Sequence, residues 1–533
     1  MADSERPAPA TDPLAAPTAA EAGVAEAGAA EAIAADSITA ASGSDRPATE
    51  LARTVAAAHE AQAIWSEKPV SARIRAVEKA KRAILEAADE IARIVAEECG
   101  KPESEALLAE ITPNADLFDF WLANIEEALE HDEVALDAIA FPGKTGHIEL
   151  VARGVVALIT PWNFPVAIPL RTLVPALLAG NAVVWKPSEI TPRSGEAVAK
   201  LLAPFFPEGL IGLVQGDGQV GEALVRGDIN LVVFTGSVAT GRRIGAICGE
   251  RLIPCGLELG GKDAAIVLAD ADLERAARGI AWGAFNNAGQ NCASIERVYV
   301  ERSVLAPFTE KVLAVVKAME TPRDMGRLTT EAQAKIVKRH VDRAIADGNV
   351  LLAGGAPDEQ DVRLFPPTVL SVTNERTPLM QEETFGPVLP IVAIDDADHG
   401  IACANASAFG LTTSIWTKAA RGEMLARKVS SGVVTINNHG FTAAIPGAPW
   451  TGVRDTGTGV TNSLHVMAEL TRPKFVLSDT SRGKSELWWY PYTPALRTIA
   501  KSLAVVRGGG GPIDRIKALG KLVGAFPKRL RGG

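Results

Sequence analysis

The sequence predicts an α/β protein built around a doubly wound parallel sheet, and two observations carry this prediction. From about residue 149 onward, short runs rich in Val, Ile and Leu alternate with stretches of helical spacing. These runs are Val155–Ile159, Ala182–Trp185, Leu231–Phe234 and Ala264–Leu268. Strands separated by helices imply parallel β-α-β units. The length of 533 residues exceeds what one hydrophobic core usually holds, so two or three domains are expected.

Composition and charge narrow the class of function. The formal net charge of -10 argues against a nucleic-acid-binding surface on the main body. The five cysteines show no CxxC or Cys/His ligand spacing, so neither a metal site nor a disulfide framework is expected. No segment is typical of a signal peptide or a transmembrane helix, and a cytoplasmic enzyme is the expectation.

The N-terminal part divides into a tail and a helical region. Residues 1–45 are rich in Ala, Pro, Glu and Asp without a large apolar cluster, so a disordered tail is expected. Residues 47–131 have helical spacing, and Gly100 is placed to end a helix. One face of this region carries the apolar side chains Val77, Ile84, Ala88, Ile91 and Val95.

A second α/β stretch and a different C-terminal segment complete the chain. The stretch runs from about 260 to 440 and includes the strand-like run Val433–Ile436. Aromatic residues then cluster at 488–492, and Gly508–Gly511 predict a flexible hinge. A basic segment follows, with helical spacing of Ile513, Ile516, Leu519, Leu522 and Val523.

Cys292 ends the segment Phe285-Asn-Asn-Ala-Gly-Gln-Asn-Cys292, in which small and amide residues flank the thiol. Gly289 lets the backbone turn sharply, and amides supply hydrogen bonds without adding charge. A cysteine in such a loop can act as a nucleophile once its thiolate is favoured. The alternative is a buried, inert thiol, which is common among free cysteines.

Two further polar residues lie in apolar or constrained surroundings. Glu258, in Leu-Glu258-Leu-Gly-Gly-Lys262, is a candidate for a raised pKa and for general-base work. Its alternative is an N-cap or a structural ion pair with Lys262. Asn163 follows an apolar strand between two prolines, where an amide can help to form an oxyanion hole. Its alternative is an asparagine that caps a turn.

Two segments lie where nucleotides bind in doubly wound sheets, at the carboxyl ends of strands. Lys186 and Glu189 follow one strand, and the acid could accept hydrogen bonds from a ribose diol; the alternative is two solvated loop charges. Gly236 and Ser237 follow another and could present N–H and hydroxyl groups to a pyrophosphate. The formal GxGxxG match at 216–221 is interpreted as a turn into a helix, because no acid follows about twenty residues later at the end of a clear strand.

From about residue 50 to about 480, these segments resemble the motifs of the aldehyde dehydrogenase superfamily in order and spacing. The resemblance implies that Cys292 is the catalytic cysteine and Glu258 the general base. Asn163 would be the side-chain donor of the oxyanion hole, and the backbone N–H of Cys292 the other donor.

The resemblance also implies a set of cofactor-binding residues. These are Thr160, Pro161, Trp162, Lys186, Glu189, Gly236, Ser237, Glu383 and Phe385. Within this set, Lys186 and Glu189 would hold the adenosine ribose. Glu383 and Phe385 would position the nicotinamide ribose and ring.

The fold implied by the resemblance has three parts and a homo-oligomeric state, either dimer or tetramer. A Rossmann-like cofactor-binding domain would comprise 46–137 and 153–259, and an α/β catalytic domain 260–448. A small β oligomerisation flap would comprise 138–152 and 464–482. The C-terminal extension would comprise 483–533.

The implied reaction converts an aldehyde into a carboxylic acid. The Cys292 thiolate adds to the carbonyl, the thiohemiacetal gives hydride to NAD(P), and Glu258 activates a water that hydrolyses the thioester. Dehydrogenases that release the thioester to CoA typically lack this glutamate, so water is the expected acceptor. A carboxylate at Glu189 should bond the 2′-hydroxyl of NAD and repel a 2′-phosphate, so NAD is preferred and NADP remains possible.

Arg171, eight residues after Asn163 on a predicted helix, is the candidate substrate contact. Succinate-semialdehyde dehydrogenases carry an arginine at the matching place, where it could bind a carboxylate. Enzymes similar to those acting on aromatic aldehydes also have it. Asn286 stands where the semialdehyde enzymes often have a second arginine. The alternative for Arg171 is a structural salt bridge.

Two stretches depart from the family pattern. The family usually has Gly-Gly-Lys-x-Ser-Gly where this chain has Thr451-Gly-Val-Arg-Asp-Thr-Gly457, which leaves the conformation of that loop open. The segment after about residue 485 extends beyond the usual end, and residues 512–533 form its last part. Their basic and apolar side chains predict either an amphipathic helix that contacts a membrane surface or a protein, or a flexible, solubilising tail.

Overall fold

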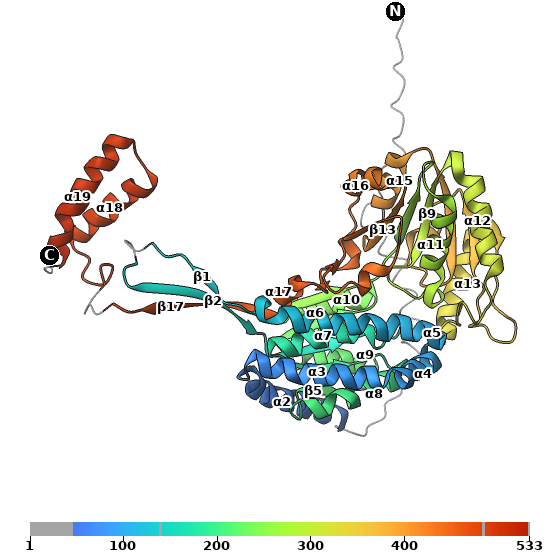
Figure 1. Ribbon diagram of the computed structural model, residues 1–533, viewed down its shortest axis with the longest axis horizontal. Coiled ribbons are helices and arrows are strands. Elements are labelled where there is room, and N and C mark those ends of the chain that lie inside the picture. The colour runs from blue at the N-terminus through green and yellow to red at the C-terminus, as the bar shows by residue number, and fades with distance from the viewer. Residues whose placement is uncertain (1–45, 138–140, 482–485, 531–533) are drawn as a thin grey trace, which may run out of the picture. The chain divides into compact units, whose positions relative to one another are not determined.

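The computed structural model describes residues 46–137, 141–481 and 486–530 (Figure 1). The predicted disordered tail, residues 1–45, lies outside the described residues, as do parts of the predicted flap and C-terminal extension. The chain divides into two compact units, residues 1–53 and 54–533. Of the first unit only the beginning of helix α2 (Arg46–Ser66) is described. The remaining elements belong to the second unit.

The first sheet is parallel throughout and has five strands in the order β5-β4-β3-β6-β7. The strands are β5 (Ile211–Leu213), β4 (Ala182–Lys186), β3 (Val155–Ile159), β6 (Leu231–Thr235) and β7 (Cys255–Glu258). Three predicted strands are therefore confirmed here. Ile159 pairs in register with Lys186 on one side and Phe234 on the other, so the segments that follow these strands start at one edge of the sheet.

Helices surround this sheet, as the alternation of the sequence predicts. They are α3 (Val70–Glu86), α4 (Ala88–Cys99), α5 (Glu103–Ala106), α6 (Thr112–Ala128), α7 (Ala167–Ala179), α8 (Pro192–Leu202), α9 (Gly218–Arg226) and α10 (Val238–Arg251). Helix α3 packs against α6, α7 and α8, and α9 packs against α10. The predicted apolar positions Val77, Ile84, Ile91 and Val95 are buried, and Gly100 ends α4 with a φ of 79°.

The second sheet has seven strands in the order β10-β11-β12-β9-β8-β13-β14, and only β10 runs antiparallel to its neighbour. The strands are β10 (Val350–Ala353), β11 (Thr368–Val372), β12 (Val388–Ile394), β9 (Ile295–Glu301), β8 (Asp263–Val267), β13 (Thr412–Trp416) and β14 (Val433–Ile436). The principal helices are α11 (Leu273–Phe285), α12 (Leu305–Ala318), α13 (Glu331–Ala346), α15 (Ala397–Asn405) and α16 (Ala419–Ala426). Their apolar faces and the sheet form one continuous buried core.

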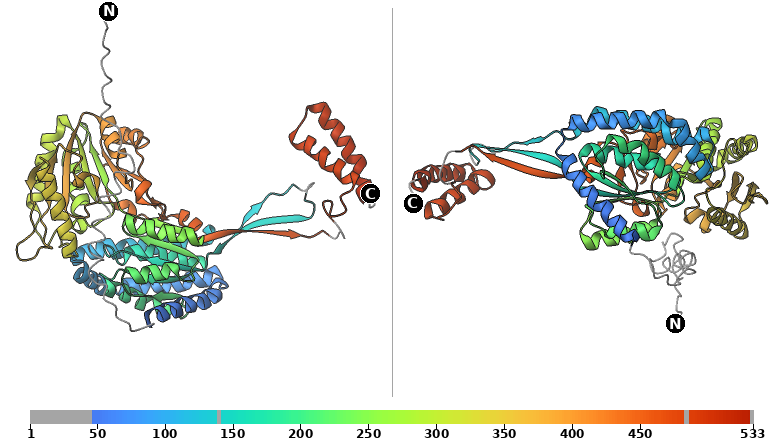
Figure 2. Two further views of the ribbon diagram at one scale, coloured as in Figure 1. Left: turned by 180° about the vertical axis from the view of Figure 1, so that it is seen from behind. Right: turned by 90° about the horizontal axis from the view of Figure 1, so that it is seen from below.

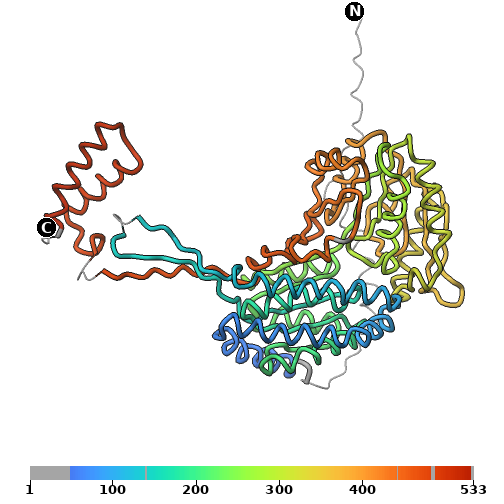
Figure 3. Tube along the Cα trace, viewed as in Figure 1, coloured from blue at the N-terminus to red at the C-terminus, as the bar shows by residue number. Residues whose placement is uncertain are grey.

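A third, antiparallel sheet is formed by β1 (Asp132–Val134), β2 (Lys144–Ala152) and β17 (Thr471–Asp479), and we call it the flap. Strands β2 and β17 run side by side although they lie far apart in the sequence (Figure 3). Their register runs from Ala152 paired with Thr471 to Lys144 paired with Asp479. The predicted flap segments 138–152 and 464–482 contain β2 and β17, but residues 464–470 are helical, and β1 lies in the segment predicted to belong to the cofactor-binding domain.

Two C-terminal helices, α18 (Pro494–Gly508) and α19 (Pro512–Leu530), follow the flap and pack against each other (Figure 2). The predicted glycine hinge lies at the turn between them. The basic segment is therefore a packed helix, and the alternative of a flexible tail is wrong for its described part. None of the helices in the described residues is long and apolar enough to cross a membrane.

Candidate active site

The loop that carries Cys292 has an unusual backbone. It follows α11 and contains Asn287 and Ala288, whose φ angles of 50° and 53° are uncommon for residues with a side chain. Gly289 has a φ of 71°, and a Cβ there would lie 2.2 Å from the carbonyl oxygen of Gly386. The loop therefore requires the predicted glycine for its turn and for its close contact with the segment at Gly386.

Cys292 lies in the wall of a cavity of about 1110 Å³. Its apolar lining includes Phe164, Ile168, Trp282, Phe285 and Trp450. Arg171 on α7 lines the same cavity, and its guanidinium makes no hydrogen bond or ion pair with any residue that the structure describes. The alternative of a structural salt bridge is therefore wrong. Burial lowers the pKa of Arg171, and the nearby Glu258 carboxylate offsets part of that effect.

Asn163 is buried and bonded to the cysteine loop. Its Nδ2 donates to the carbonyl of Gln290 at 3.2 Å, two residues before Cys292. In return, Asn287 Nδ2 donates to the Asn163 carbonyl at 3.1 Å. An amide has two N–H donors, and the second one on Asn163 has no partner among the described residues. The Cys292 backbone N–H is likewise unpaired within the described chain.

Glu258 is the last residue of β7 and is supported by the loop whose sequence departs from the family pattern. An isolated bridge joins Glu258 to Gly457, and the N–H of Leu259 donates to the carbonyl of Thr456 at 2.9 Å. These contacts are made by backbone atoms, so the loop holds Glu258 despite its altered side chains. Lys262 pairs with the buried Glu296 and not with Glu258, so that alternative is wrong.

Both Glu258 and Cys292 have pKa values raised above those of exposed glutamates and cysteines. Burial raises the pKa of Glu258 to about 7, and the positive charge of Arg171 offsets part of this effect. One carboxylate oxygen of Glu258 is buried without a hydrogen-bond partner among the described residues. Burial also raises the pKa of the Cys292 thiol to about 12, and the charges of Asp263, Glu258 and Glu383 add to it while Arg171 opposes it. Glu258 and Arg171 thus both lie within electrostatic reach of the thiol.

The paired glycines after Glu258 permit a close approach of three chain segments. A Cβ on Gly260 would lie 2.5 Å from a carboxylate oxygen of Glu383, and one on Gly261 would lie 2.2 Å from the Cys292 carbonyl. The N–H of Gly261 donates to Glu383 Oε1 at 2.9 Å. Burial raises the pKa of Glu383 to about 8. The structure therefore brings Glu383 beside the Cys292 loop.

The predicted ribose contacts lie at the carboxyl edge of the first sheet. Lys186 is buried, and its Nζ lies 3.0 Å from Glu189 Oε2, while the Glu189 side chain is 52% exposed. The alternative of two solvated charges is therefore wrong for Lys186. A Cβ on Gly221 would lie 3.9 Å from Lys186 Cδ, which places the first turn of α9 beside it. The segment 216–221 is the predicted turn into a helix, with Asp217 as the N-cap of α9.

The other predicted cofactor contacts follow the strands of the first sheet or pack against the residues that do. Ser237 is the N-cap of α10, directly after β6. The rings of Trp162 and Phe385 meet edge to face at 5.5 Å. Thr160 is buried, and its hydroxyl accepts a hydrogen bond from Trp185 Nε1 at 2.9 Å. Two helix N-termini beside a buried lysine and an exposed carboxylate fit a dinucleotide, because its phosphates are anions and its ribose carries hydroxyl donors.

Two buried acids that position this site were not predicted from the sequence. Glu296 on β9 accepts the N–H groups of Thr384 and Phe385, both at 2.8 Å, and so holds Phe385 at a φ of 51°. Glu110 accepts the N–H of Ala167 at 2.8 Å and pairs with Lys101 at 3.0 Å. Glu296 could have been predicted from the sequence, because an acid within an apolar strand is buried and a buried charge needs hydrogen-bond or ion-pair partners.

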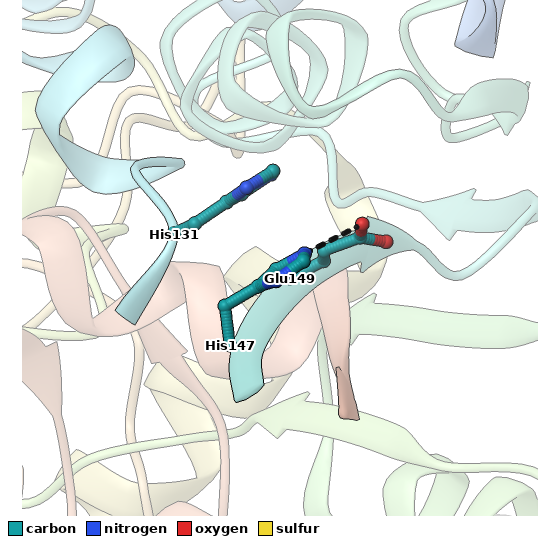
Figure 4. Close-up of side chains that lie close together, drawn as sticks. All are labelled: His131, His147 and Glu149. Carbon is teal, nitrogen blue, oxygen red and sulfur yellow. Dashed lines mark hydrogen bonds and ion pairs between the residues drawn. The ribbon is translucent and has the colours of Figure 1, made fainter. Parts of the chain in front are cut away.

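One group of three potential metal ligands is found among the described residues, namely His131, His147 and Glu149 (Figure 4). The last two lie on β2 of the flap, and none of the three lines the cavity of Cys292. The rings of His131 and His147 stack at 4.9 Å, and His147 Nε2 lies 3.2 Å from Glu149 Oε1. The other carboxylate oxygen of Glu149 pairs with Lys474 at 2.6 Å. Both oxygens are therefore occupied by protein groups, and we assign this cluster a structural role.

Comparison with known proteins agrees with this geometry. The model of the aldehyde dehydrogenase family matches residues 31–476. The chain is 37% identical to a 4,4'-diapolycopene aldehyde oxidase of Methylomonas, over 81% of this chain and 82% of that one. It is 34% identical to a putative NADP succinate-semialdehyde dehydrogenase of Mycolicibacterium smegmatis, over 85% of this chain and 90% of that one.

Solved structures give the same result. The NAD+ complex of an aldehyde dehydrogenase from Bacillus cereus matches with a TM-score of 0.78 at 29% identity, over 82% of this chain and 90% of that one. An NAD-dependent aldehyde dehydrogenase from Sinorhizobium meliloti matches with a TM-score of 0.78 at 32% identity, over 83% and 89%. The chain therefore belongs to the aldehyde dehydrogenase family and is an NAD(P)-dependent aldehyde dehydrogenase.

Proposed function

We propose that this enzyme oxidises its aldehyde to a free carboxylic acid, with Cys292 as nucleophile, Glu258 as general base and NAD as the preferred cofactor. One observation carries the proposal. The Cys292 thiol lines the large cavity, the backbone of Gly261, three residues after Glu258, closely approaches the Cys292 carbonyl, and burial raises the pKa of Glu258 to about 7. A base is most useful when its pKa lies near the working pH, because it is then both deprotonated and basic.

The proposed chemistry uses four groups of the chain. The Cys292 thiol loses its proton to solvent, and the thiolate sulfur forms a bond to the carbonyl carbon as the carbon–oxygen π bond breaks. The resulting oxyanion is stabilised by the free N–H of Asn163 and the backbone N–H of Cys292. The bound cofactor supplies a hydride acceptor. After hydride loss the carbon is held as a thioester on Cys292. Glu258 then takes a proton from water as the water oxygen attacks that carbon, and the carbon–sulfur bond breaks to free the acid.

Release of the acyl group to water and not to CoA is the testable core of this proposal. Purified enzyme with NAD and an aldehyde is expected to form one acid for each NADH over many turnovers without added CoA. Chromatographic quantification of the acid, alongside NADH absorbance, measures this ratio. A strict requirement for CoA after the first turnover would contradict the proposal.

The preference for NAD rests on the half-exposed carboxylate of Glu189. Glu189→Gln is expected to raise the ratio of kcat/KM for NADP to that for NAD by about tenfold, because a neutral amide no longer repels a 2′-phosphate. Initial rates with both cofactors measure the ratio. Glu196→Gln is the matched control, since Glu196 is an exposed acid on α8. An unchanged ratio in Glu189→Gln would remove the basis for the preference.

An aldehyde that carries a carboxylate is one candidate substrate, because Arg171 lines the cavity and its guanidinium has no hydrogen-bond or ion-pair partner among the described residues. The succinate-semialdehyde relatives support this choice. Arg171→Met is expected to raise KM for succinate semialdehyde about 10- to 100-fold, the value of a hydrogen bond to a charged group, but not KM for butanal. Initial-rate kinetics with both aldehydes measure the difference.

A large apolar or aromatic aldehyde is the second candidate. The cavity is lined by several aromatic side chains, and a Methylomonas relative is named for 4,4'-diapolycopene aldehyde. Equal effects of Arg171→Met on succinate semialdehyde and butanal would contradict carboxylate recognition and favour this second candidate.

A further inference from the structure

Helix α19 turns its large apolar side chains outward. Five of them recur every three or four residues and form one stripe on the helix. These exposed residues, which we call the apolar stripe, are Ile513, Ile516, Leu519, Val523 and Phe526. Ile516 and Val523 are 71% and 66% exposed. Within the described part of the chain, nothing covers this stripe.

The packing of α19 against α18 makes the exposure informative. Among the described apolar side chains, α19 fully buries the small Ala518 and Ala525 and half-buries Leu522, while α18 buries Leu496 and Ile499. A helix that served only to cover its neighbour would place its large apolar side chains inward. A contiguous apolar surface of this kind marks an interaction site.

An aromatic segment lies beside the end of α19. Trp488, Trp489, Tyr490 and Tyr492 all have exposed side chains. The guanidinium of Arg529, near the end of α19, donates to the carbonyls of Leu487 and Trp489, so helix and segment are joined. Tryptophan and tyrosine are enriched at membrane–water interfaces, because one end of each side chain is apolar and the other is polar.

The charge of this region is opposite to that of the whole chain. Residues 488–530 contain eight Lys and Arg side chains and one acid, Asp514, although the chain carries a net charge of -10. Lys517, Lys521 and Lys528 on α19 are exposed, and none of them makes an ion pair with a described residue. At 100° per residue these lysines lie on the side of the helix away from the apolar stripe.

We propose that α18, α19 and the segment 488–492 dock this enzyme on an anionic phospholipid surface. The apolar stripe and the aromatic side chains would enter the headgroup region, and the unpaired lysines would attract the anionic lipids. Helix α19 lies along the surface and does not span the bilayer. A lipid surface fits better than a protein partner, because this region is basic in a chain whose net charge is -10, and anionic headgroups supply the complementary charge over the whole area that the helices cover. This proposal does not depend on the proposed catalytic chemistry.

Flotation of the full-length enzyme with vesicles tests this docking. Wild-type enzyme is expected to float with phosphatidylcholine vesicles that contain phosphatidylglycerol, less so at high salt, and not with pure phosphatidylcholine. Ile516→Gln with Val523→Gln should lower partitioning at least about tenfold. Lys517→Gln and Lys521→Gln should each lower it about fivefold. Met424→Gln on α16 is the matched control, because Met424 is 65% exposed on a different helix.

The remaining outcomes would overturn the proposal. Failure of the wild type to float with anionic vesicles would do so, as would equal flotation of the stripe variant and Met424→Gln. A stripe variant with an altered sedimentation coefficient, together with no vesicle binding by the wild type, would instead assign the stripe to a second copy of the chain. Unchanged oxidation of a short, water-soluble aldehyde by every variant shows that the proteins are folded.

Discussion

Cys292→Ala is expected to abolish aldehyde oxidation, with kcat/KM falling by roughly 10⁴-fold or more, because the substitution removes the sulfur that forms the proposed covalent intermediate. The substitution removes only the sulfur from a loop whose shape is set by Asn287, Gly289 and Gln290. NADH production under saturating cofactor measures the rate. The Cys292→Ala enzyme is expected to bind NAD still, and isothermal titration calorimetry measures this binding.

Cys403→Ala is the control for this experiment. Cys403 is also a partly buried free thiol, but it lies on α15 and does not line the cavity of Cys292. Its substitution is expected to leave the rate close to that of the wild type. A Cys292→Ala enzyme that retained a substantial fraction of wild-type turnover would show that the nucleophile is another group.

Glu258→Gln is expected to lower steady-state turnover by about 10²- to 10⁴-fold, the usual contribution of a general base. The amplitude of the first turnover, one NADH for each active site, should remain, because hydride loss precedes the attack of water. Rapid-mixing absorbance separates the two phases. Glu250→Gln, at an exposed position on α10, is the control.

The pH dependence of deacylation in the wild type and in Glu258→Gln tests the role of Glu258 a second time. Burial raises the pKa of Glu258 to about 7, so the carboxylate is protonated and inactive as a base below that pH and deprotonated above it. Wild-type deacylation should therefore fall as the pH drops through about 7. The Glu258→Gln enzyme should lack this limb. An unchanged limb in the variant would assign the titration to a different group.

Much of the fold could be predicted because local signals and long-range structure agree. Buried parallel strands read as continuous apolar runs, and β3, β4 and β6 were found in this way. Parallel pairing then places the ends of these strands at one edge, so the segments holding Glu189 and Ser237 follow neighbouring strands. Strand pairing alone does not predict which side chains form hydrogen bonds or ion pairs with one another.

The contacts that were missed join residues far apart in the sequence. Lys262 lies four residues after Glu258, yet its partner is Glu296 on another strand. Glu110 supports the start of α7 from a turn of a different helix, and no local spacing signals that contact. The loop 451–457 supports Glu258 through backbone atoms, which side-chain identities do not reveal.

Mass spectrometry of the Glu258→Gln enzyme tests whether the acyl group is carried by Cys292 and released by water. The enzyme is mixed with NAD and an aldehyde in the absence of CoA, quenched in acid and digested. The peptide containing Cys292 is expected to gain the mass of the acyl group, and the adduct is expected to decay far more slowly than in the wild type. An acyl group on another residue, or no adduct during continued turnover, would contradict it.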